Sequence, residues 1–305
     1  MTSPRTVIPI ALALSLGACR DAPDPPAAPP SVSRPEARET ACPTQPNIDG
    51  AADNLVLTAR LAGRPIRILV DTGASGASVS PELAESMRPI PGRTARFAGA
   101  EGRFRESPVY AVSGLDIGGT ELGPFDAYRF AIAKETGADL AIGLEQLAPY
   151  VVDMDFSQGV FCLRSEPVDL GRAGQPIARG RDGQGDVIVS ARFGEFTADR
   201  MIFDTGAGVS AVNEDLLSRL ESERLPDAVV SVDAAGFRKR QYFVRVPQMC
   251  VLGACKARQI LMPGADLSEL TGYRVHGYVG LPFMRGLRVV LDFPRGQMAL
   301  MEPAT

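Results

Sequence analysis

Two apolar runs of the chain end in the same polar triplet. One run lies at 68–70 and the other at 201–203, and the triplet Asp-Thr-Gly follows at 71–73 and at 204–206. Short apolar runs bounded by turn residues are typical of buried strands. After each triplet comes a second short apolar stretch, and then residues suited to begin a helix. The pattern therefore predicts the same four elements twice: a buried strand, a turn that carries Asp, a short strand and a short helix.

The similarity between the two halves continues beyond the triplets. Segment 142–163 starts with Ile-Gly-Leu and aligns without a gap with segment 279–300, which starts with Val-Gly-Leu. Both contain a strand that ends in Asp-Phe, followed by Gly and Leu at the same spacing. Asp-Thr-Gly alone occurs by chance in many proteins, whereas two copies in register with a shared downstream element indicate an internal repeat. The residues by themselves therefore indicate a β-rich chain made of two homologous units.

Each unit resembles a lobe of the retropepsin-like aspartic proteases, which are related to the pepsin-like enzymes. The tandem resembles a fused, single-chain version of two such lobes, and the resemblance covers residues 50–302. It implies an all-β, two-lobed acid-protease fold with short helices, in which two homologous lobes are related by a pseudo-twofold axis. It also implies that the two Asp-Thr-Gly loops meet at this axis, above the apolar-apolar-Gly elements at 141–143 and 278–280.

Composition divides the chain around these two units. We expect a lipoprotein signal peptide at 1–18, a proline-rich tether at 19–47, the first lobe at 48–165, an inter-lobe linker at 166–186 and the second lobe at 187–305. The tether has few large apolar side chains, so it cannot bury enough surface to fold alone. It would either space the lobes from a membrane surface or be a leader without a spacing role. The linker is rich in glycine and has no sustained apolar period.

The amino terminus has the pattern of an export signal. Arg5 precedes an apolar run at 7–16, which is too short to remain as a membrane-spanning helix. Cys19 directly follows Leu-Gly-Ala, which resembles the lipobox of bacterial lipoproteins and implies a mature chain that begins at Cys19 with acyl chains attached. The alternative is an ordinary signal peptide with an incidental cysteine. Because no Asp follows Cys19 directly, we expect a lipid-anchored, periplasm-facing protein of the bacterial cell envelope, on the outer membrane rather than the inner one.

The candidate catalytic residues are Asp71 and Asp204. The chain has a single histidine, His276, which argues against Ser-His-Asp and Cys-His catalysis and against histidine-based metal sites. Two carboxylates held close together share one proton, so that one can activate a water while the other hydrogen-bonds a peptide carbonyl. The alternative is that each Asp only caps its turn. The resemblance implies supporting roles for four loop residues, the threonines locking the loops and the glycines allowing close approach: Thr72, Gly73, Thr205 and Gly206.

Two glycine-containing hairpins match the position of the substrate-binding flaps that close over bound peptide in the family that the chain resembles. The first spans 97–104 and contains Gly99 and Gly102, and the second spans 232–237 and contains Gly236. An ordinary surface hairpin is the alternative at both positions. The first hairpin is richer in glycine, so we expect it to be the one that closes if only one does.

Five cysteines are present, and lipidation of one would leave an even number. An even number in an exported chain favours disulfides. Cys250 and Cys255 flank a predicted hairpin turn, so we expect them to pair, which leaves Cys42 to pair with Cys162. A four-cysteine zinc site is the alternative, although the spacing does not fit a metal ribbon.

Charge and composition narrow the possible partners. The net charge of −4 and the pI of about 5.3 leave no basic stripe for nucleic acid. We expect no metal, no cofactor, a polypeptide substrate, membrane association only through lipid on Cys19, and a monomer because both lobes lie in one chain. The predicted function is an aspartic endopeptidase that acts on envelope or periplasmic polypeptides with a water activated by the Asp71/Asp204 dyad. The alternative is a non-catalytic peptide-binding or assembly module on the same fold.

Overall fold

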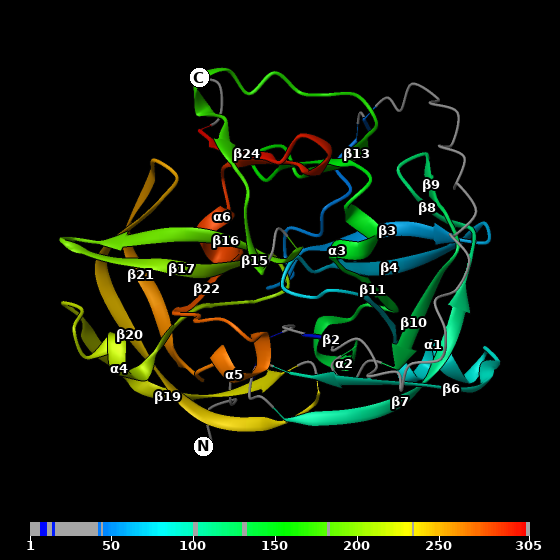
Figure 1. The fold of residues 1–305 in the computed structure, drawn as a ribbon, viewed down its shortest axis with the longest axis horizontal. Helices are drawn as coiled ribbons and strands as arrows, with labels where there is room; N and C mark the ends of the chain where they lie inside the picture. The colour runs from blue at the N-terminus through cyan, green and yellow to red at the C-terminus, as the bar shows by residue number, and fades with distance from the viewer. Residues whose placement is uncertain are drawn as a thin grey trace, which may run out of the picture.

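Strands dominate the fold, and they form three sheets in the part of the chain that the structure describes (Figure 1). The computed structural model describes residues 7–10, 14–15, 42–43, 45–99, 103–129, 133–181, 184–233 and 235–302. The α-helices in these ranges are single turns: α1 (Pro81–Glu85), α2 (Ala133–Thr136), α3 (Leu144–Leu147), α4 (Glu214–Leu217), α5 (Ser268–Thr271) and α6 (Leu281–Met284). None of the helices in these ranges is long and apolar enough to cross a membrane. The prediction of an all-β fold with short helices is confirmed.

The first lobe is built on one large sheet. Within the described ranges its strands run in the order β2-β6-β7-β10-β5-β11-β4-β3-β8-β9. Their bounds are β2 (Leu14–Ser15), β3 (Val56–Leu61), β4 (Arg64–Val70), β5 (Ala77–Val79), β6 (Pro89–Ala98), β7 (Phe104–Val112), β8 (Leu115–Ile117), β9 (Thr120–Leu122), β10 (Phe125–Arg129) and β11 (Leu140–Ile142).

A second large sheet forms the other lobe. Its described strands run in the order β1-β19-β20-β21-β18-β22-β17-β16-β15, and β20 also pairs with β16. Their bounds are β1 (Val7–Ile10), β15 (Ala178–Arg181), β16 (Gln184–Phe193), β17 (Phe196–Asp204), β18 (Ser210–Asn213), β19 (Glu223–Asp233), β20 (Arg238–Val251), β21 (Ala254–Gly264) and β22 (Gly277–Gly280).

The central strands of both sheets repeat one pairing pattern. In the first lobe β11 runs parallel to β4 and antiparallel to β5, and β5 runs parallel to β10. In the second lobe β22 stands in the same relation to β17 and β18, and β18 runs parallel to β21. These central strands are buried, with Ile68 on β4 and Phe203 on β17 fully enclosed, so each stabilises its lobe by about 2–3 kcal/mol of apolar burial. The central strands of the two sheets are therefore paired in the same way.

A third sheet joins the two lobes. Its described strands run in the order β13-β12-β23-β24-β14, and β12 of the first lobe pairs antiparallel with β23 of the second, so that Asp155 lies opposite Arg288. Next to this seam the buried Asp153 carboxylate accepts two hydrogen bonds from the Arg288 guanidinium (2.9 and 2.8 Å) and one from Arg164 (3.0 Å). The bounds are β12 (Val151–Asp155), β13 (Val160–Arg164), β14 (Gln175–Pro176), β23 (Arg288–Asp292) and β24 (Gln297–Met301), and the 3₁₀ turns η1 (Gly171–Ala173) and η2 (Phe293–Arg295) lie beside them.

Both cysteine pairings expected from the sequence are present. Cys42 is joined to Cys162 across a separation of 120 residues, and Cys250 is joined to Cys255 where β20 turns into β21. In the chain-entropy description, closing a loop as long as the one between Cys42 and Cys162 stabilises the folded protein by about 5 kcal/mol, because it restricts the unfolded chain. The first disulfide therefore ties the chain just before the first lobe to strand β13.

The linker contains more regular structure than its glycine content predicts. Within 166–186, strand β14 pairs with β24 and strand β15 pairs with β16. An edge strand presents unpaired N–H and C=O groups, and an extended linker segment satisfies them by joining the sheet. Part of the linker therefore belongs to the sheets, and the lobe boundaries at 165 and 187 stay predictions.

Part of the segment expected to be a signal peptide pairs with both large sheets. β1 runs parallel to β19, with Val7 opposite Val230, and β2 runs antiparallel to β6, with Leu14 opposite Ala98. The same physical cause applies, since β19 and β6 each have an edge with open hydrogen-bonding groups. This pairing concerns the unprocessed chain and does not test cleavage. Cys19 and most of the tether lie outside the described residues.

Candidate active site

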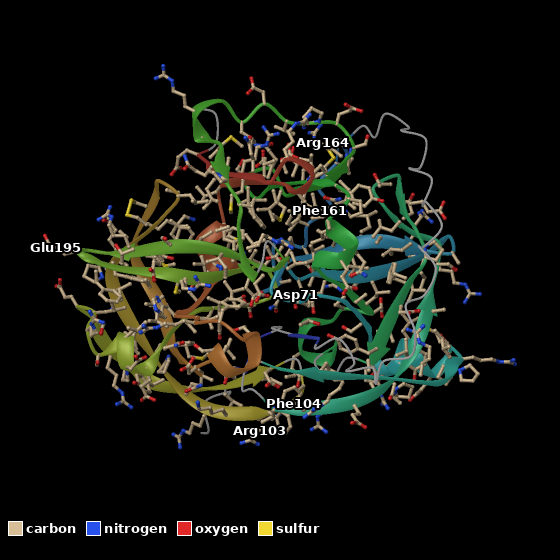
Figure 2. The ribbon with its side chains drawn as sticks, in the orientation of Figure 1. Asp71, Arg103, Phe104, Phe161, Arg164 and Glu195 are labelled. Carbon is tan, nitrogen blue, oxygen red and sulfur yellow. A yellow bond between two sulfur atoms is a disulfide. The ribbon has the colours of Figure 1, made fainter. Side chains whose placement is uncertain are left out.

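The two Asp-Thr-Gly loops lie at the ends of the two central strands. Asp71 follows β4 directly and Asp204 is the last residue of β17, and Figure 2 places Asp71 at the middle of the molecule. Both side chains are buried, with 1% and 0% of their surface exposed. Each carboxylate accepts one hydrogen bond from its own loop, Asp71 from the Gly73 N–H (2.9 Å) and Asp204 from the Gly206 N–H (2.8 Å). The short loop therefore aims each carboxylate in a fixed direction.

Contact between the loops explains the glycine at 206. A Cβ added to Gly206 would lie 2.4 Å from the Asp71 Cγ, so any larger residue would displace the carboxyl group. The Gly206 carbonyl oxygen also accepts a hydrogen bond from the Asn54 side-chain amide of the first lobe. The second loop is therefore packed directly against the carboxyl group of the first.

Four hydrogen bonds made by two threonines lock the loops together. The Thr72 hydroxyl donates to the Phe203 carbonyl (2.6 Å) and accepts from the Thr205 N–H (3.0 Å). In the mirrored pair, the Thr205 hydroxyl donates to the Val70 carbonyl (2.7 Å) and accepts from the Thr72 N–H (3.1 Å). All four bonds cross between the lobes and are buried, so each lobe satisfies the backbone of the other.

A glycine from each lobe supports the loop of that lobe. A Cβ on Gly143 would lie 2.5 Å from the Ala74 carbonyl oxygen, and one on Gly280 would lie 2.8 Å from the Ala207 carbonyl oxygen. The residue after each glycine donates its N–H to the same carbonyl, at 2.8 Å from Leu144 and 2.9 Å in the second lobe. The apolar-apolar-Gly elements therefore lie against the loops, and only glycine permits this spacing.

The electrostatics of the site favour a shared proton. Burial, together with the charge of the neighbouring Asp204, raises the pKa of Asp71 well above its usual value. Burial also raises the pKa of Asp204 to about 7, although hydrogen bonds from Asp71 and from the Gly206 N–H oppose this rise. A pair with these properties holds one proton and one negative charge near neutral pH.

The two predicted flaps meet each other. The hairpins β6–β7 and β19–β20 approach from opposite lobes along the lower side of the view in Figure 1. A Cβ on Gly99 would overlap the Asp233 carboxyl group at 2.2 Å, so the two tips are in contact. The Arg105 guanidinium donates to the Ala235 carbonyl (2.6 Å), and Gly236 turns the second tip with a φ of +79°. Gly102 lies outside the described residues.

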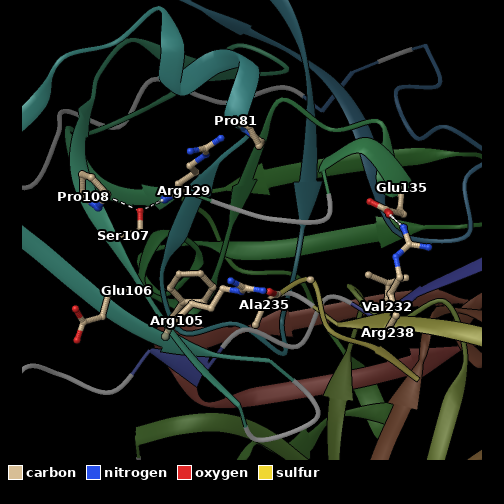
Figure 3. A pocket seen from close by; sticks show the side chains of 12 residues that line it. Pro81, Arg105, Glu106, Ser107, Pro108, Arg129, Glu135, Val232, Ala235 and Arg238 are labelled. Atoms are coloured by element: carbon tan, nitrogen blue, oxygen red, sulfur yellow. Dashed lines mark hydrogen bonds and ion pairs between the residues drawn. The ribbon is translucent and has the colours of Figure 1, made fainter. Parts of the chain in front are cut away.

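A cavity of about 490 Å³ lies between the second flap and the first lobe (Figure 3). Pro81 and Arg129 form the side that belongs to the first lobe, and Arg238 on the second flap makes an ion pair with Glu135. The cavity is large enough for side chains of an extended peptide. The described residues include no group of three or more His, Cys, Asp and Glu side chains arranged to hold a metal ion.

Three residues near the loops were not identified from the sequence. Asn54 contacts the second loop, as described above. Asp186 is a third buried carboxyl, and its charge is one of the causes that raise the pKa values of both Asp71 and Asp204. Tyr128 has a buried hydroxyl without a hydrogen-bond partner among the described residues, and burial followed by the Asp71 charge raises its pKa. Counting strand register outward from the β3–β4 turn would have pointed to Asn54.

Residues 57–145, which lie in the first lobe, match the family model described as aspartyl protease. This match includes Asp71 and Gly143 and ends before Asp204. No curated protein matches the chain.

Proposed function

We propose that the protein is an aspartic endopeptidase that hydrolyses peptide bonds with a water activated by Asp71 and Asp204. The observation that carries the proposal is the interlocked pair of Asp-Thr-Gly loops, which holds two buried carboxyl groups together. A turn cap would not need the same carboxyl in both lobes, nor the crossing threonine bonds. The family match supports this reading for the first lobe, and the repeated strand pairing extends it to the second as a tandem of two homologous units.

The mechanism follows from one proton on two carboxyl groups. The ionised Asp takes a proton from a water held between the pair, and the water oxygen attacks the peptide carbonyl carbon. The protonated Asp gives its proton to the carbonyl oxygen, which forms a tetrahedral diol. When the C–N bond breaks, the leaving nitrogen takes a proton from the dyad and one diol hydroxyl returns its proton. The dyad ends with one proton, as it began.

An extended polypeptide is the substrate that the site would accept. The proposed binding site lies between the loops and the two flaps, where the flap strands offer open edges. Extended peptides bind such edges through backbone hydrogen bonds, while pockets select the side chains. The pairing of β1 with β19 and of β2 with β6 supports this, because each flap strand accepts a further strand there. Since both lobes lie in one chain, we infer that the protein acts as a monomer.

The proposed location is the bacterial cell envelope. It rests on the sequence Leu-Gly-Ala before Cys19, which would place lipid on that cysteine and the two lobes in the periplasm, on the outer membrane. Envelope or periplasmic polypeptides would then be the substrates. The two disulfides support an oxidising compartment.

The test is to replace each aspartate separately in the purified protein. We expect Asp71→Asn and Asp204→Asn each to lower kcat/KM for an unstructured polypeptide such as denatured casein at least about 1,000-fold, because either change removes the shared proton. Glu195→Gln, at the exposed turn between β16 and β17, removes one charge far from the loops and should leave activity unchanged.

Two results would contradict the proposal. Substantial activity in either aspartate variant would show that the pair is not the catalyst. A wild-type protein that binds peptides without cleaving any, with equal affinity in Asp71→Asn, would instead support a non-catalytic peptide-binding module.

A further inference from the structure

A third acidic residue stands beside the dyad in one lobe only. In the second lobe β16 pairs antiparallel with β17, and Ile188 lies opposite Ile202. Asp186 lies two residues before Ile188 and Asp204 lies two residues after Ile202, so these two stand opposite each other. In an antiparallel pair, directly opposed residues have Cβ atoms about 4.5–5.5 Å apart. The register therefore brings the Asp186 carboxyl close to the dyad.

The first lobe has a neutral residue at the matching position. There β3 pairs with β4, and Val56 lies opposite Leu69, which sets Asn54 opposite Asp71. The Asn54 amide uses its N–H to hold the Gly206 carbonyl of the other loop. An ionised carboxylate has no N–H to give, so Asp186 cannot make the mirrored bond. The two lobes therefore differ in charge at the same place.

Asp186 is held by a different partner. Its side chain is 3% exposed, and its Oδ2 accepts a hydrogen bond from the Tyr273 hydroxyl, just after α5. The Tyr273 ring in turn lies against the Arg200 guanidinium of β17, at 5.2 Å. A side chain on Gly180 of β15 would overlap the Tyr273 hydroxyl, so the glycine makes room for this bond.

The charged groups around Asp186 do not neutralise it. Arg179 on β15 attracts the carboxylate, yet its own Nη1 is buried without a hydrogen-bond partner among the described residues. Burial raises the pKa of Asp186, while the Tyr273 bond and Arg179 lower it. Asp186 makes no ion pair with a described residue, and the remaining charges that face it are Asp71 and Asp204.

We propose that Asp186 is a positioning residue of the active site, whose buried negative charge, held by Tyr273, keeps the shared proton on the dyad up to higher pH. The inference rests on the proposed peptidase function and adds a residue outside both Asp-Thr-Gly loops. A negative charge within several ångströms disfavours a second charge on the dyad and so preserves its singly protonated form. Its contribution to the raised pKa of both Asp71 and Asp204 agrees with this geometry.

The test compares the pH dependence of kcat/KM in the wild type and in Asp186→Asn, which keeps the size of the side chain and removes the charge. We expect the basic limb of the profile to move to lower pH by about one unit. Tyr273→Phe removes the hydrogen bond that favours the ionised Asp186, so its basic limb should move in the same direction by a smaller amount. Tyr273→Phe also keeps the inference testable if Asp186→Asn does not fold.

Glu195→Gln is the matched control. It removes the same charge at the opposite end of the same hairpin, and Figure 2 shows Glu195 at the far edge of the molecule from Asp71. Its profile should equal that of the wild type. A basic limb that stays in place in folded Asp186→Asn, or that moves equally in Glu195→Gln, would overturn the inference.

A second measurement separates this inference from the proposed function. Carboxyl carbon NMR of protein labelled at aspartate reads the titration of Asp71 and Asp204 without any turnover. If the wild type cleaves no peptide, the proposed function fails, yet a downward shift of the dyad titration in Asp186→Asn would still support the inference. If the wild type cleaves peptides and neither the titration nor the basic limb moves, the inference fails alone.

Discussion

Two carboxyl groups at the site are buried, although carboxylates are ordinarily most stable in water. Asp71 and Asp204 are enclosed, and the hydrogen bonds from Gly73 and Gly206 offset only part of the lost hydration. The result is a pair that is easier to protonate in the folded chain than in the unfolded chain. Such a difference makes the stability of the fold depend on pH.

Asp204→Asn should reveal this dependence. The pKa of Asp204 is raised to about 7 in the folded chain, against about 3.9 when unfolded, so the unfolded chain ionises first as the pH rises. The stability that comes from the protonated folded form is fully present below about pH 4 and is lost as the pH rises to about 7. We therefore expect Asp204→Asn to gain stability over the wild type, on the order of 4 kcal/mol, between about pH 4 and pH 8. Urea unfolding at both pH values measures this gain.

The comparison with the wild type is needed because other carboxyl groups act in the opposite direction. A hydrogen bond from Arg67 lowers the pKa of Asp49, and one from Ser268 lowers the pKa of Asp266. Stability from these two is present above about pH 4 and is lost as the pH falls below their unfolded values. They are the same in both proteins and cancel in the difference. A difference that does not change with pH would refute the expected titration of Asp204.

At the scale of elements, the tips of the two flap hairpins contact each other. The second tip reaches the first lobe through Arg238, which pairs with Glu135 of α2, and through the Ala235 carbonyl, which accepts a hydrogen bond from Arg105. The guanidinium groups of Arg103 and Arg105 also lie over the Phe237 ring, at 4.9 and 4.7 Å. The second flap, which has fewer glycines, is therefore tied to the opposite lobe at several points. The sequence favoured the first flap as the one that closes if only one does. The contacts described here belong to the tip of the second flap, which was not expected from its glycine content.

Breaking the ion pair at the tip should weaken the contact between the second flap and the first lobe. Glu135→Gln removes the charge that holds Arg238, and an ion pair that is partly open to solvent, as this one is through Arg238, contributes up to about 1 kcal/mol. We expect KM for a peptide substrate to rise up to about 5-fold, with faster amide hydrogen exchange at residues 235–238. Both changes follow from a larger fraction of open flap.

A second ion pair on the same hairpin supplies the control. Arg245 pairs with Glu223 at the base of the flap, at 2.9 Å. Glu223→Gln breaks another Glu–Arg pair, whose glutamate is more exposed than Glu135, without touching the tip. KM and exchange at 235–238 should therefore stay as in the wild type. Equal effects of the two substitutions would show that the tip contact does not govern opening.

At the scale of the whole molecule, one chain supplies both halves of the site. The third sheet runs through both lobes by the pairing of β12 with β23, and Asp153 binds Arg288 across it. Together with the threonine bonds, this seam holds the lobes in the orientation that brings the two loops together. The seam lies on one side of the loops and the flaps on the other (Figure 1).

The position of the molecule in the cell depends on its amino terminus. If Cys19 carries lipid, the mature chain lacks β1 and β2 and partitions with membranes, since several acyl chains give stable anchoring. We expect mass spectrometry to find an acylated Cys19 at the mature amino terminus, and Cys19→Ala to shift the protein from the detergent phase to the aqueous phase. Arg20→Ala, next to the acylation site, should partition as the wild type. A mature chain that begins at Met1 and stays in the aqueous phase would show that the leader remains and that lipid anchoring is wrong.

Local pattern alone determined the strands that carry Asp71 and Asp204 and a β-rich chain, because apolar runs and turn residues act within a few neighbours. The repeat predicted two similar units, the family resemblance implied that their loops meet, and the number and spacing of the cysteines predicted both disulfides. The pairing of β1, β2, β14 and β15 could not be predicted from the pattern of apolar and turn residues, since it depends on which sheet edges remain open after folding.

The residues beside the dyad show why tertiary structure was needed. In the first lobe the register of β3 and β4 is regular from the turn to the loop, so a count from the turn places Asn54 opposite Asp71. In the second lobe the register of β16 and β17 shifts between Val189 and Ala191. Counting from that turn would place Gly185 opposite Asp204, and the irregularity moves Asp186 there instead. A one-residue shift exchanges the two faces of a strand, so only the folded hairpin decided that a third carboxyl faces the dyad.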